Sequence, residues 1–296
     1  MLTTGMAKWQ LSAAALLSLL MPVAIANHLE ARIIGVSTWD AECSANTLTY
    51  WEDMVRFWYD EMPKHGWYHQ AGATVNGNLD SSKLCDPDIS TPGAATGCLD
   101  YRYVDDADAA MIFMHGFDSG EVWGGVLRRN TGPGGSCTVT FPDHSYNGDM
   151  RVGDVDLEFL HMSSCDSLDK DNLPYTWRVF EDPADSPRNG RRLHQLTGFH
   201  GYMWIGGCCD DQYEDFAADA HAVSIKDAWM DNMYVTGING NKNQCPVAYA
   251  VGSDLADCFA RLDHERYNNV YSDPTSIGYY CYYYYPGCDP EGKGPF

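Results

Sequence analysis

Two stretches of the sequence decide the fold. Residues 107–116 are ADAAMIFMHG and residues 155–165 are VDLEFLHMSSC, two apolar runs of strand length. The first ends in a His-Gly pair and the second in a Ser-Cys pair. In an open α/β sheet, reactive residues gather just beyond the carboxyl ends of the strands. If these two strands are neighbours, His115 and Cys165 face one cleft.

Further candidate elements alternate around these two runs. An apolar stripe at spacings of three and four predicts a helix that follows a cap at Asn46 or Thr47 and packs on a sheet: Trp51, Met54, Val55, Trp58, Tyr59 and Met62. Strands are predicted over residues 32–39, 201–207 and 246–253, and helices over residues 191–197, 213–234 and 254–267. The alternation predicts an α/β sandwich with a mostly parallel sheet.

The remaining segments of the sequence are rich in loop-forming residues. Glycine, asparagine, aspartate, serine and proline dominate residues 70–100, 117–148 and 169–190, which we interpret as insertions tied by disulfides. We expect one domain over residues 27–296, with its core at about 32–265. The tail, residues 266–296, contains YYCYYYYPGC and is interpreted as a disulfide-tied strand packed on the body, or as an aromatic binding surface.

The first 26 residues predict a secretory signal peptide. Lys8 precedes the apolar run LSAAALLSLLMPVAIA, whose small-residue exit predicts cleavage after Ala26. An uncleaved membrane anchor is the alternative, but the run is short for a span and no later run reaches about 18 apolar residues. We therefore expect a secreted, extracellular protein, whose cysteines form disulfides in an oxidising compartment.

The number of cysteines, 11, indicates that at least one is free or bonded to another molecule, because an odd number cannot pair completely within one chain. Setting Cys165 aside leaves ten candidates for disulfides: Cys43, Cys85, Cys98, Cys137, Cys208, Cys209, Cys245, Cys258, Cys281 and Cys288. Sequence does not fix their pairing. Two local pairs are expected, Cys85 with Cys98 and Cys281 with Cys288, and the adjacent Cys208 and Cys209 are expected to reach different partners.

The two strand ends suit nucleophilic catalysis. A cysteine thiolate attacks an acyl carbon, and a nearby imidazole activates it or protonates the leaving amine. Gly116 leaves its backbone N–H open to approach, so that it can hold a developing oxyanion. His115 and Cys165 are therefore candidate catalytic residues, with Gly116 beside them.

This pattern resembles the caspase, legumain and gingipain group of cysteine peptidases (clan CD), in which one apolar strand ends in His-Gly and a later one in Ala-Cys or Ser-Cys. The resemblance covers mainly residues 32–235. It implies a three-layer α/β/α sandwich, with His115 as the catalytic histidine, Cys165 as the nucleophile, and the N–H groups of Gly116 and Cys165 as oxyanion donors.

Two further features qualify the resemblance. SCDSL (164–168) and KDAWMDNMY (226–234) look closest to a secreted caspase-like family of unknown function. His161 departs from the pattern, because the peptidases carry an apolar or neutral residue inside the second strand. The resemblance implies a secreted cysteine-dependent hydrolase that cleaves or transfers peptide bonds. Two alternatives stay open: a catalytically silent secreted binding module on the same fold, and a secreted metal-dependent enzyme.

The substrate is expected to be a peptide or protein. A net charge of -22 argues against nucleic acid or an anionic membrane as partner. Asp210 and Asp211 follow a predicted strand near the cleft and are candidates for selecting a cationic side chain. Ser164 is a further candidate for substrate contact. The oligomeric state stays open.

The sequence also contains residues that could form a metal site or act as a second base. The residues His115, His161, Cys165, Cys208 and Cys209 include zinc ligand types, but no zinc-binding spacing is present. Acidic clusters at 105–109, 166–172 and 208–215 lack the calcium-loop pattern and are interpreted as solvated loops, with structural calcium left possible. No cofactor is expected. His200 is interpreted as a loop histidine that precedes a strand.

Overall fold

The computed structural model describes residues 29–40, 42–70, 72–87, 97–132, 135–143, 148–180, 193–206, 209 and 211–296. The predicted signal peptide, Cys208 and Asp210 lie outside these residues. Among the described residues, no helix combines the length and the apolar composition that a membrane span requires.

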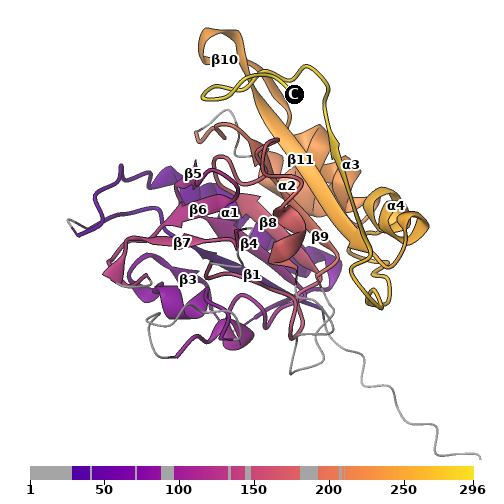
Figure 1. Cartoon of the computed structure of the whole chain (residues 1–296), viewed down its shortest axis with the longest axis horizontal. Helices are drawn as coiled ribbons and strands as arrows, with labels where there is room; N and C mark the ends of the chain where they lie inside the picture. The colour runs from indigo at the N-terminus through magenta and orange to yellow at the C-terminus, as the bar shows by residue number, and fades with distance from the viewer. Residues whose placement is uncertain are drawn as a thin grey trace, which may run out of the picture.

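The centre of the molecule is a nine-stranded sheet in the order β10-β11-β9-β8-β4-β1-β2, with β12 paired to β11 and β3 to β1 (Figure 1). The strands are β1 (Glu30–Gly35), β2 (Tyr68–His69), β3 (Thr74–Val75), β4 (Ala109–Phe113), β8 (Phe159–Ser163), β9 (Gln195–His200), β10 (Val235–Ile238), β11 (Lys242–Gly252) and β12 (Tyr279–Tyr284). The pairings of β1 with β2, β3 and β4, of β4 with β8, and of β8 with β9 are parallel, whereas β10, β11 and β12 pair antiparallel. The prediction of an α/β fold with a mostly parallel sheet is confirmed.

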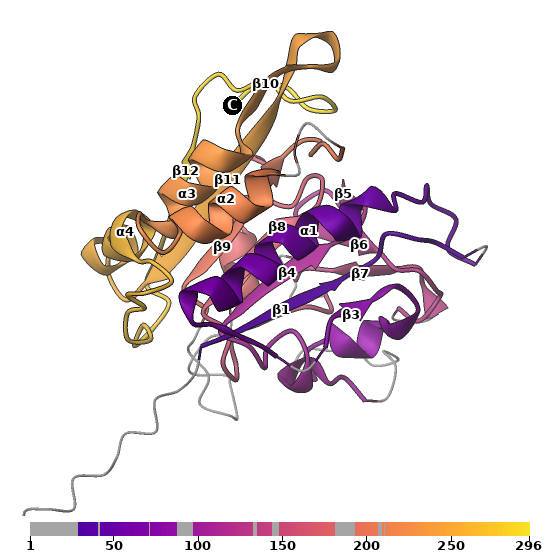
Figure 2. The ribbon, with the colours of Figure 1, turned by 180° about the vertical axis from the view of Figure 1, so that it is seen from behind.

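Helices cover one face of this sheet: α1 (Tyr50–Glu61), α2 (Asp211–Asp219), α3 (Ile225–Met233) and α4 (Leu255–His264) (Figure 2). Side chains alternate between the faces of a strand, and on β4 Met111 and Phe113 join the core under the helices while Ile112 joins the opposite core. The predicted apolar stripe is buried in the helix-side core, which confirms that part of the prediction. The predicted cap at Asn46 or Thr47 is wrong, because the helix begins at Tyr50, directly after Thr49.

The opposite face is covered differently. A small antiparallel sheet packs there, formed by β5 (Gly116–Asp118), β6 (Trp123–Val126) and β7 (Thr138–Thr140). Trp123 and Val139 of this sheet share a core with Met162 of β8. In the described part of the chain, this face is completed by irregular segments and short 3-10 turns.

Three sequence predictions of local structure are wrong. The strand predicted at 201–207 ends earlier, because β9 already finishes at His200. Residues 195–197, predicted as helical, belong to that strand, since their side chains are buried between two sheet neighbours. The single helix predicted over 213–234 is divided into α2 and α3 because Ser224 caps α3: its hydroxyl accepts the Asp227 N–H at 3.0 Å.

The tail is a strand packed on the body, as the first interpretation predicted: β12 pairs along β11. Cys85 pairs with Cys98, as expected, but the expected Cys281–Cys288 pair is wrong. Cys258 of α4 pairs with Cys281, and Cys245 of β11 pairs with Cys288. The pairing follows the packing of β12, which places Cys281 against α4 and the turn after β12 against the start of β11.

A fourth described pair joins Cys43 to Cys137, and Cys209 is also disulfide-bonded. Cys165 is the free cysteine of the described residues. The expectation that Cys165 stands apart from the structural cysteines is therefore confirmed for the part of the chain described here.

Candidate active site

The candidate site begins with the register of two neighbouring strands. β4 and β8 run parallel, and Phe113 at the end of β4 lies beside Ser163 at the end of β8. His115 and Cys165 each follow two residues later. The predicted adjacency of the two strands is confirmed, and both residues lie at the same edge of the sheet.

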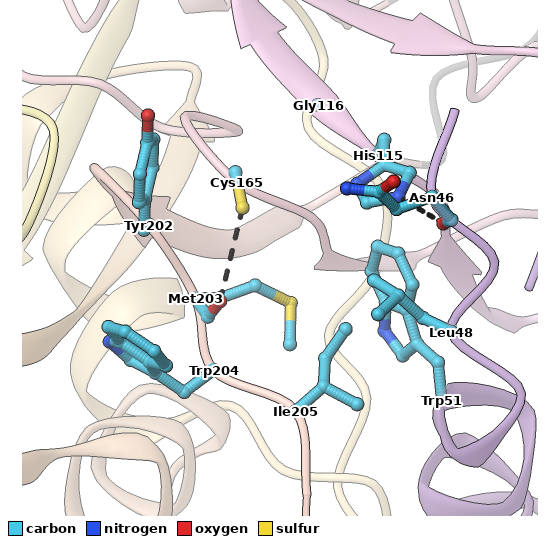
Figure 3. A pocket seen from close by; sticks show the side chains of 10 residues that line it. All are labelled: Asn46, Leu48, Trp51, His115, Gly116, Cys165, Tyr202, Met203, Trp204 and Ile205. Carbon is cyan, nitrogen blue, oxygen red and sulfur yellow. Dashed lines mark hydrogen bonds between the residues drawn. The ribbon is translucent and has the colours of Figure 1, made fainter. Parts of the chain in front are cut away.

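His115 and Cys165 line one pocket of about 410 Å³ (Figure 3). Its other lining residues come from the segment before α1, from α1 itself, from the start of β5 and from the loop after β9: Asn46, Leu48, Trp51, Gly116, Tyr202, Met203, Trp204 and Ile205. In Figure 3, His115 stands on the Trp51 side, and Met203 and Ile205 lie between that side and Tyr202. The pocket thus joins elements that are distant in the sequence.

The imidazole of His115 is fixed by one backbone group. Its Nε2 lies 2.8 Å from the carbonyl oxygen of Asn46. Because a carbonyl only accepts hydrogen bonds, Nε2 carries the proton and donates it, which leaves Nδ1 of the neutral ring with its lone pair. Trp39 and Trp51 pack on the ring with centroids 4.5 and 5.6 Å away. The contacts favour one tautomer and one orientation, those of a base acting through Nδ1.

Cys165 is protonated in the resting site. Its Sγ lies 3.9 Å from the Met203 carbonyl oxygen, a distance at which the thiol donates a weak hydrogen bond. Burial raises the pKa of the thiol to about 11, because a thiolate loses its hydration in the pocket. At neutral pH Cys165 is therefore a thiol, and forming its thiolate requires transfer of the proton to a base.

Gly116 is held against the backbone that carries Cys165. A Cβ at this position would overlap the Cys165 carbonyl oxygen, the Ser164 hydroxyl and the Trp123 indole nitrogen. The Val126 N–H donates to the His115 carbonyl at 2.8 Å, so the next pair along the ladder, Gly116 and Gly125, is the non-hydrogen-bonded one. The Gly116 N–H therefore points away from β6, free of that ladder.

Ser164 lies beside the pocket without lining it. It is fully buried, its hydroxyl donates to the Met114 carbonyl at 2.8 Å, and it accepts the Trp123 indole N–H at 3.0 Å. Asp211 begins α2 as an exposed residue and is absent from the pocket lining. Asp210 lies outside the described residues. The structure thus brings together His115, Gly116 and Cys165 at the pocket, whereas Ser164 and Asp211 are not part of its lining.

Two other histidines, His200 and His161, are buried in the fold and do not line the pocket. His200 is buried at the end of β9, which corrects its interpretation as a loop residue before a strand, and its Nε2 lies 2.8 Å from the Gly294 carbonyl oxygen. His161 is buried under the helices between the Thr197 and Tyr267 hydroxyls, at 2.8 and 2.6 Å. Burial lowers the pKa of His161 to about 3, so that its ring is neutral.

The interpretation of the acidic clusters as solvated loops is wrong at Asp105. This carboxylate is fully buried and accepts the N–H groups of Gly153, Asp154 and Val155 at 2.6, 2.7 and 3.2 Å. It therefore organises a loop by bonding backbone. Across the described residues, His, Cys, Asp and Glu side chains form no group of three or more arranged to hold a metal ion.

Sequence reasoning missed most of the pocket wall. Trp51 was assigned to the core, where its Nε1–H donates to Ser163 at 2.8 Å, but it also lines the pocket. Tyr202, Met203 and Ile205 were assigned to a strand. Their composition is strand-like and gave no local signal of a binding loop, because the end of β9 at His200 is evident only from the structure.

The fold and the pocket together define a mixed α/β protein with a free cysteine and a histidine at one sheet edge. A family model described as a domain of unknown function (DUF6345) matches residues 36–282. The match spans most of the chain, which therefore belongs to this family. No curated protein matches the sequence.

Proposed function

We propose that the protein is a secreted cysteine-dependent hydrolase that cleaves or transfers peptide bonds on a caspase-like three-layer sandwich. One observation carries the proposal: the free cysteine of the described residues, Cys165, shares a pocket with a histidine whose Nδ1 is available to accept a proton. A cysteine left unpaired among disulfides, beside a base, suits nucleophilic catalysis.

In the proposed reaction, His115 Nδ1 takes the proton of the Cys165 thiol as the sulfur attacks the carbonyl carbon of a peptide bond. His115 then gives this proton to the amide nitrogen, the C–N bond breaks, and the amine leaves a thioester on Cys165. Water attacks the thioester carbon, or an amine does so in a transfer reaction, and His115 Nδ1 takes the proton of the attacking group. The acyl C–S bond then breaks, the carboxylic acid or the new amide leaves, and Nδ1 returns the proton to the sulfur, which restores the resting thiol.

The oxyanion of each tetrahedral intermediate needs donors. The N–H of Gly116 points away from the β6 ladder, and the N–H of Cys165 lies next to the nucleophile. A pair of preorganised N–H groups is the usual arrangement for this charge. Gly116 suits the role because it tolerates no Cβ against Ser164 and Cys165.

Secretion is part of the proposal. Four described disulfides support an oxidising compartment, since such bonds are rare where thiols are kept reduced. In that setting Cys165, the free thiol among the described cysteines, stands out from the disulfide-bonded ones. The substrate class is a peptide or protein.

The experiment incubates the mature protein with a peptide library that contains every side chain at each position, and reads cleavage by mass spectrometry. We expect cleavage by the wild type, loss of at least 1,000-fold in Cys165→Ala, and loss of about 100-fold or more in His115→Ala. His264→Ala, which changes an exposed histidine of α4, is the matched control and should cleave normally. Cleavage that persists in Cys165→Ala contradicts the proposal.

The resting thiol favours one alternative. A Cys165 pKa of about 11 and a thiol turned toward the Met203 carbonyl also suit a silent binding module that keeps the pocket. That function predicts peptide binding to the wild type with no cleaved product anywhere in the library. The same experiment therefore separates the two functions.

A further inference from the structure

The wall of the candidate pocket is apolar. Five of its lining side chains are Leu48, Trp51, Met203, Trp204 and Ile205, and they surround the space between Cys165 and His115 (Figure 3). Among the described lining residues no carboxylate and no lysine or arginine is present. A ligand group that enters this space meets hydrocarbon and ring surfaces.

The volume of about 410 Å³ lies in the range of small-ligand pockets and is ample for one large side chain with its adjoining backbone. A pocket of this character favours a large apolar group, because each methylene removed from water strengthens binding about tenfold or more. A lysine or arginine side chain would lose its hydration without a partner charge. The expected selection of cations by Asp211 has no support at this wall.

The wall is held in place by hydrogen bonds behind it. The Trp51 indole N–H donates to the Ser163 hydroxyl at 2.8 Å, and that hydroxyl lies 2.6 Å from the Tyr213 hydroxyl. On the other side, the Trp204 N–H donates to the Gln244 side-chain oxygen at 2.7 Å. Trp51 is therefore anchored through its indole N–H and Trp204 through its backbone N–H, whereas the Trp204 indole N–H has no hydrogen-bond partner among the described residues. These bonds from outside the pocket help to preserve its shape when it is empty.

The loop after β9 is anchored at both ends as well. The Tyr202 N–H donates to the Glu291 carbonyl at 3.1 Å, and the Gly206 N–H lies 3.4 Å from the Met54 sulfur. Gly292 packs directly against the Tyr202 ring, where a Cβ would overlap it. The C-terminal segment thus supports the loop that forms half of the wall.

We propose that this pocket receives a large apolar or aromatic side chain of the peptide substrate, next to the bond that Cys165 attacks. The inference rests on the proposed function for the position of the cleaved bond. The occupant of the pocket itself follows from the wall and can be measured without turnover.

The test measures equilibrium binding to full-length mature Cys165→Ala by calorimetry, with N-acetyl tetrapeptide amides that differ at one residue: Phe, Leu, Ala, Lys or Asp. We expect Phe and Leu to bind at least tenfold more tightly than Ala, and Lys and Asp no more tightly than Ala. Equal affinities, no measurable binding, or a preference for Lys or Asp overturns the inference.

A wall variant sharpens the test. Ile205→Asp places a carboxylate in the wall and should shift the preference toward Lys by tenfold or more relative to the unaltered wall. Leu255→Asp makes a similar apolar-to-acid change at a side chain that is 52% exposed on α4, and should leave the ranking unchanged. An Ile205→Asp ranking identical to that of the control, in a folded protein, contradicts the assignment of the wall.

Turnover is scored separately with the same peptides and the wild-type protein. Cleavage next to Lys by an active Cys165 would overturn the inference and leave the proposed function standing. Tight binding of Phe peptides without cleavage would overturn the proposed function and leave the pocket assignment standing.

Discussion

The Nε2 atom of His115 lies 2.8 Å from the carbonyl oxygen of Asn46, a residue 69 positions earlier in the sequence. This hydrogen bond assigns the ring proton to Nε2 and leaves Nδ1 as the acceptor. The proposed base is therefore oriented by a backbone carbonyl, whereas the proposed nucleophile, Cys165, is a partly buried thiol whose pKa is raised to about 11. The predictions below follow from this arrangement and from the packing around it.

The first prediction concerns the resting thiol. Because burial raises the pKa of Cys165 to about 11, the thiolate fraction at neutral pH is small and grows about tenfold per pH unit. The rate of Cys165 carboxamidomethylation by iodoacetamide should therefore rise about tenfold per unit from pH 7 to 9.5. Mass spectrometry of the modified peptide follows the rate. A plateau below pH 8 would reveal a preformed thiolate–imidazolium pair instead.

The second prediction concerns the close approach at Gly116. A Cβ there overlaps the Ser164 hydroxyl and the Cys165 carbonyl oxygen, so Gly116→Ala should lower the free energy of unfolding by about 1–3 kcal/mol. Denaturant unfolding measures the change. Gly77→Ala is the matched control, because the nearest atom to its Cβ is Arg128 Nη1 at 3.9 Å. Equal stability of the two variants would be incompatible with the packing described.

The third prediction concerns pH and His161. Burial lowers its pKa from 6.5 to about 3, so between these values the unfolded state binds a proton that the folded state lacks. Above pH 6.5, neutral His161 makes its full contribution to the free energy of unfolding. Below pH 6.5 that contribution falls by about 1.4 kcal/mol for each unit by which the pH decreases. His161→Gln removes this dependence, and the gap in unfolding free energy between wild type and variant should narrow from pH 6.5 to 4.5.

Denaturant unfolding at several pH values measures that gap. Asp108, whose pKa burial raises to about 7, gives the opposite trend in both proteins and cancels in the comparison. A gap that stays constant across this range would show that His161 titrates normally in the folded state.

The fourth prediction concerns the disulfide that ties β12 to α4. Cys258 and Cys281 are 23 residues apart in sequence, and closing a loop of this length stabilises the fold by about 3 kcal/mol. Replacing both by alanine should lower the free energy of unfolding by about that amount. Digestion without reduction should yield Cys258 linked to Cys281 in the wild type, and recovery of a Cys281–Cys288 link would refute the pairing.

The sequence predicted that His115 and Cys165 lie close together because the patterns that indicate this are local in the sequence. Two apolar strands ending in His-Gly and Ser-Cys predict neighbouring strand ends, and parallel strands of one sheet put those ends at one edge. The odd number of cysteines predicted that at least one stays unpaired, and the strand-end pattern selected Cys165. Both results depend on short apolar runs with distinctive end residues and on a residue count, which a single sequence displays.

The wall of the pocket was not predictable in the same way. The segment from Tyr202 to Ile205 has strand-like composition, but it is a loop fixed by the distant Gln244 and Glu291. The pairing of Cys281 was missed for the same reason, because it depends on how β12 packs against α4. Contacts between elements far apart in sequence leave no local pattern.

The most direct test of the central claim uses a peptidyl acyloxymethyl ketone with phenylalanine beside the reactive ketone, whose carboxylate leaves as sulfur bonds to carbon. We expect one label per molecule in the mature wild-type protein, mapped by mass spectrometry to Cys165. We also expect labelling at least 100-fold slower in folded His115→Ala. Labelling at another residue, or equal rates in the two proteins, would contradict a Cys165–His115 pair that works as nucleophile and base.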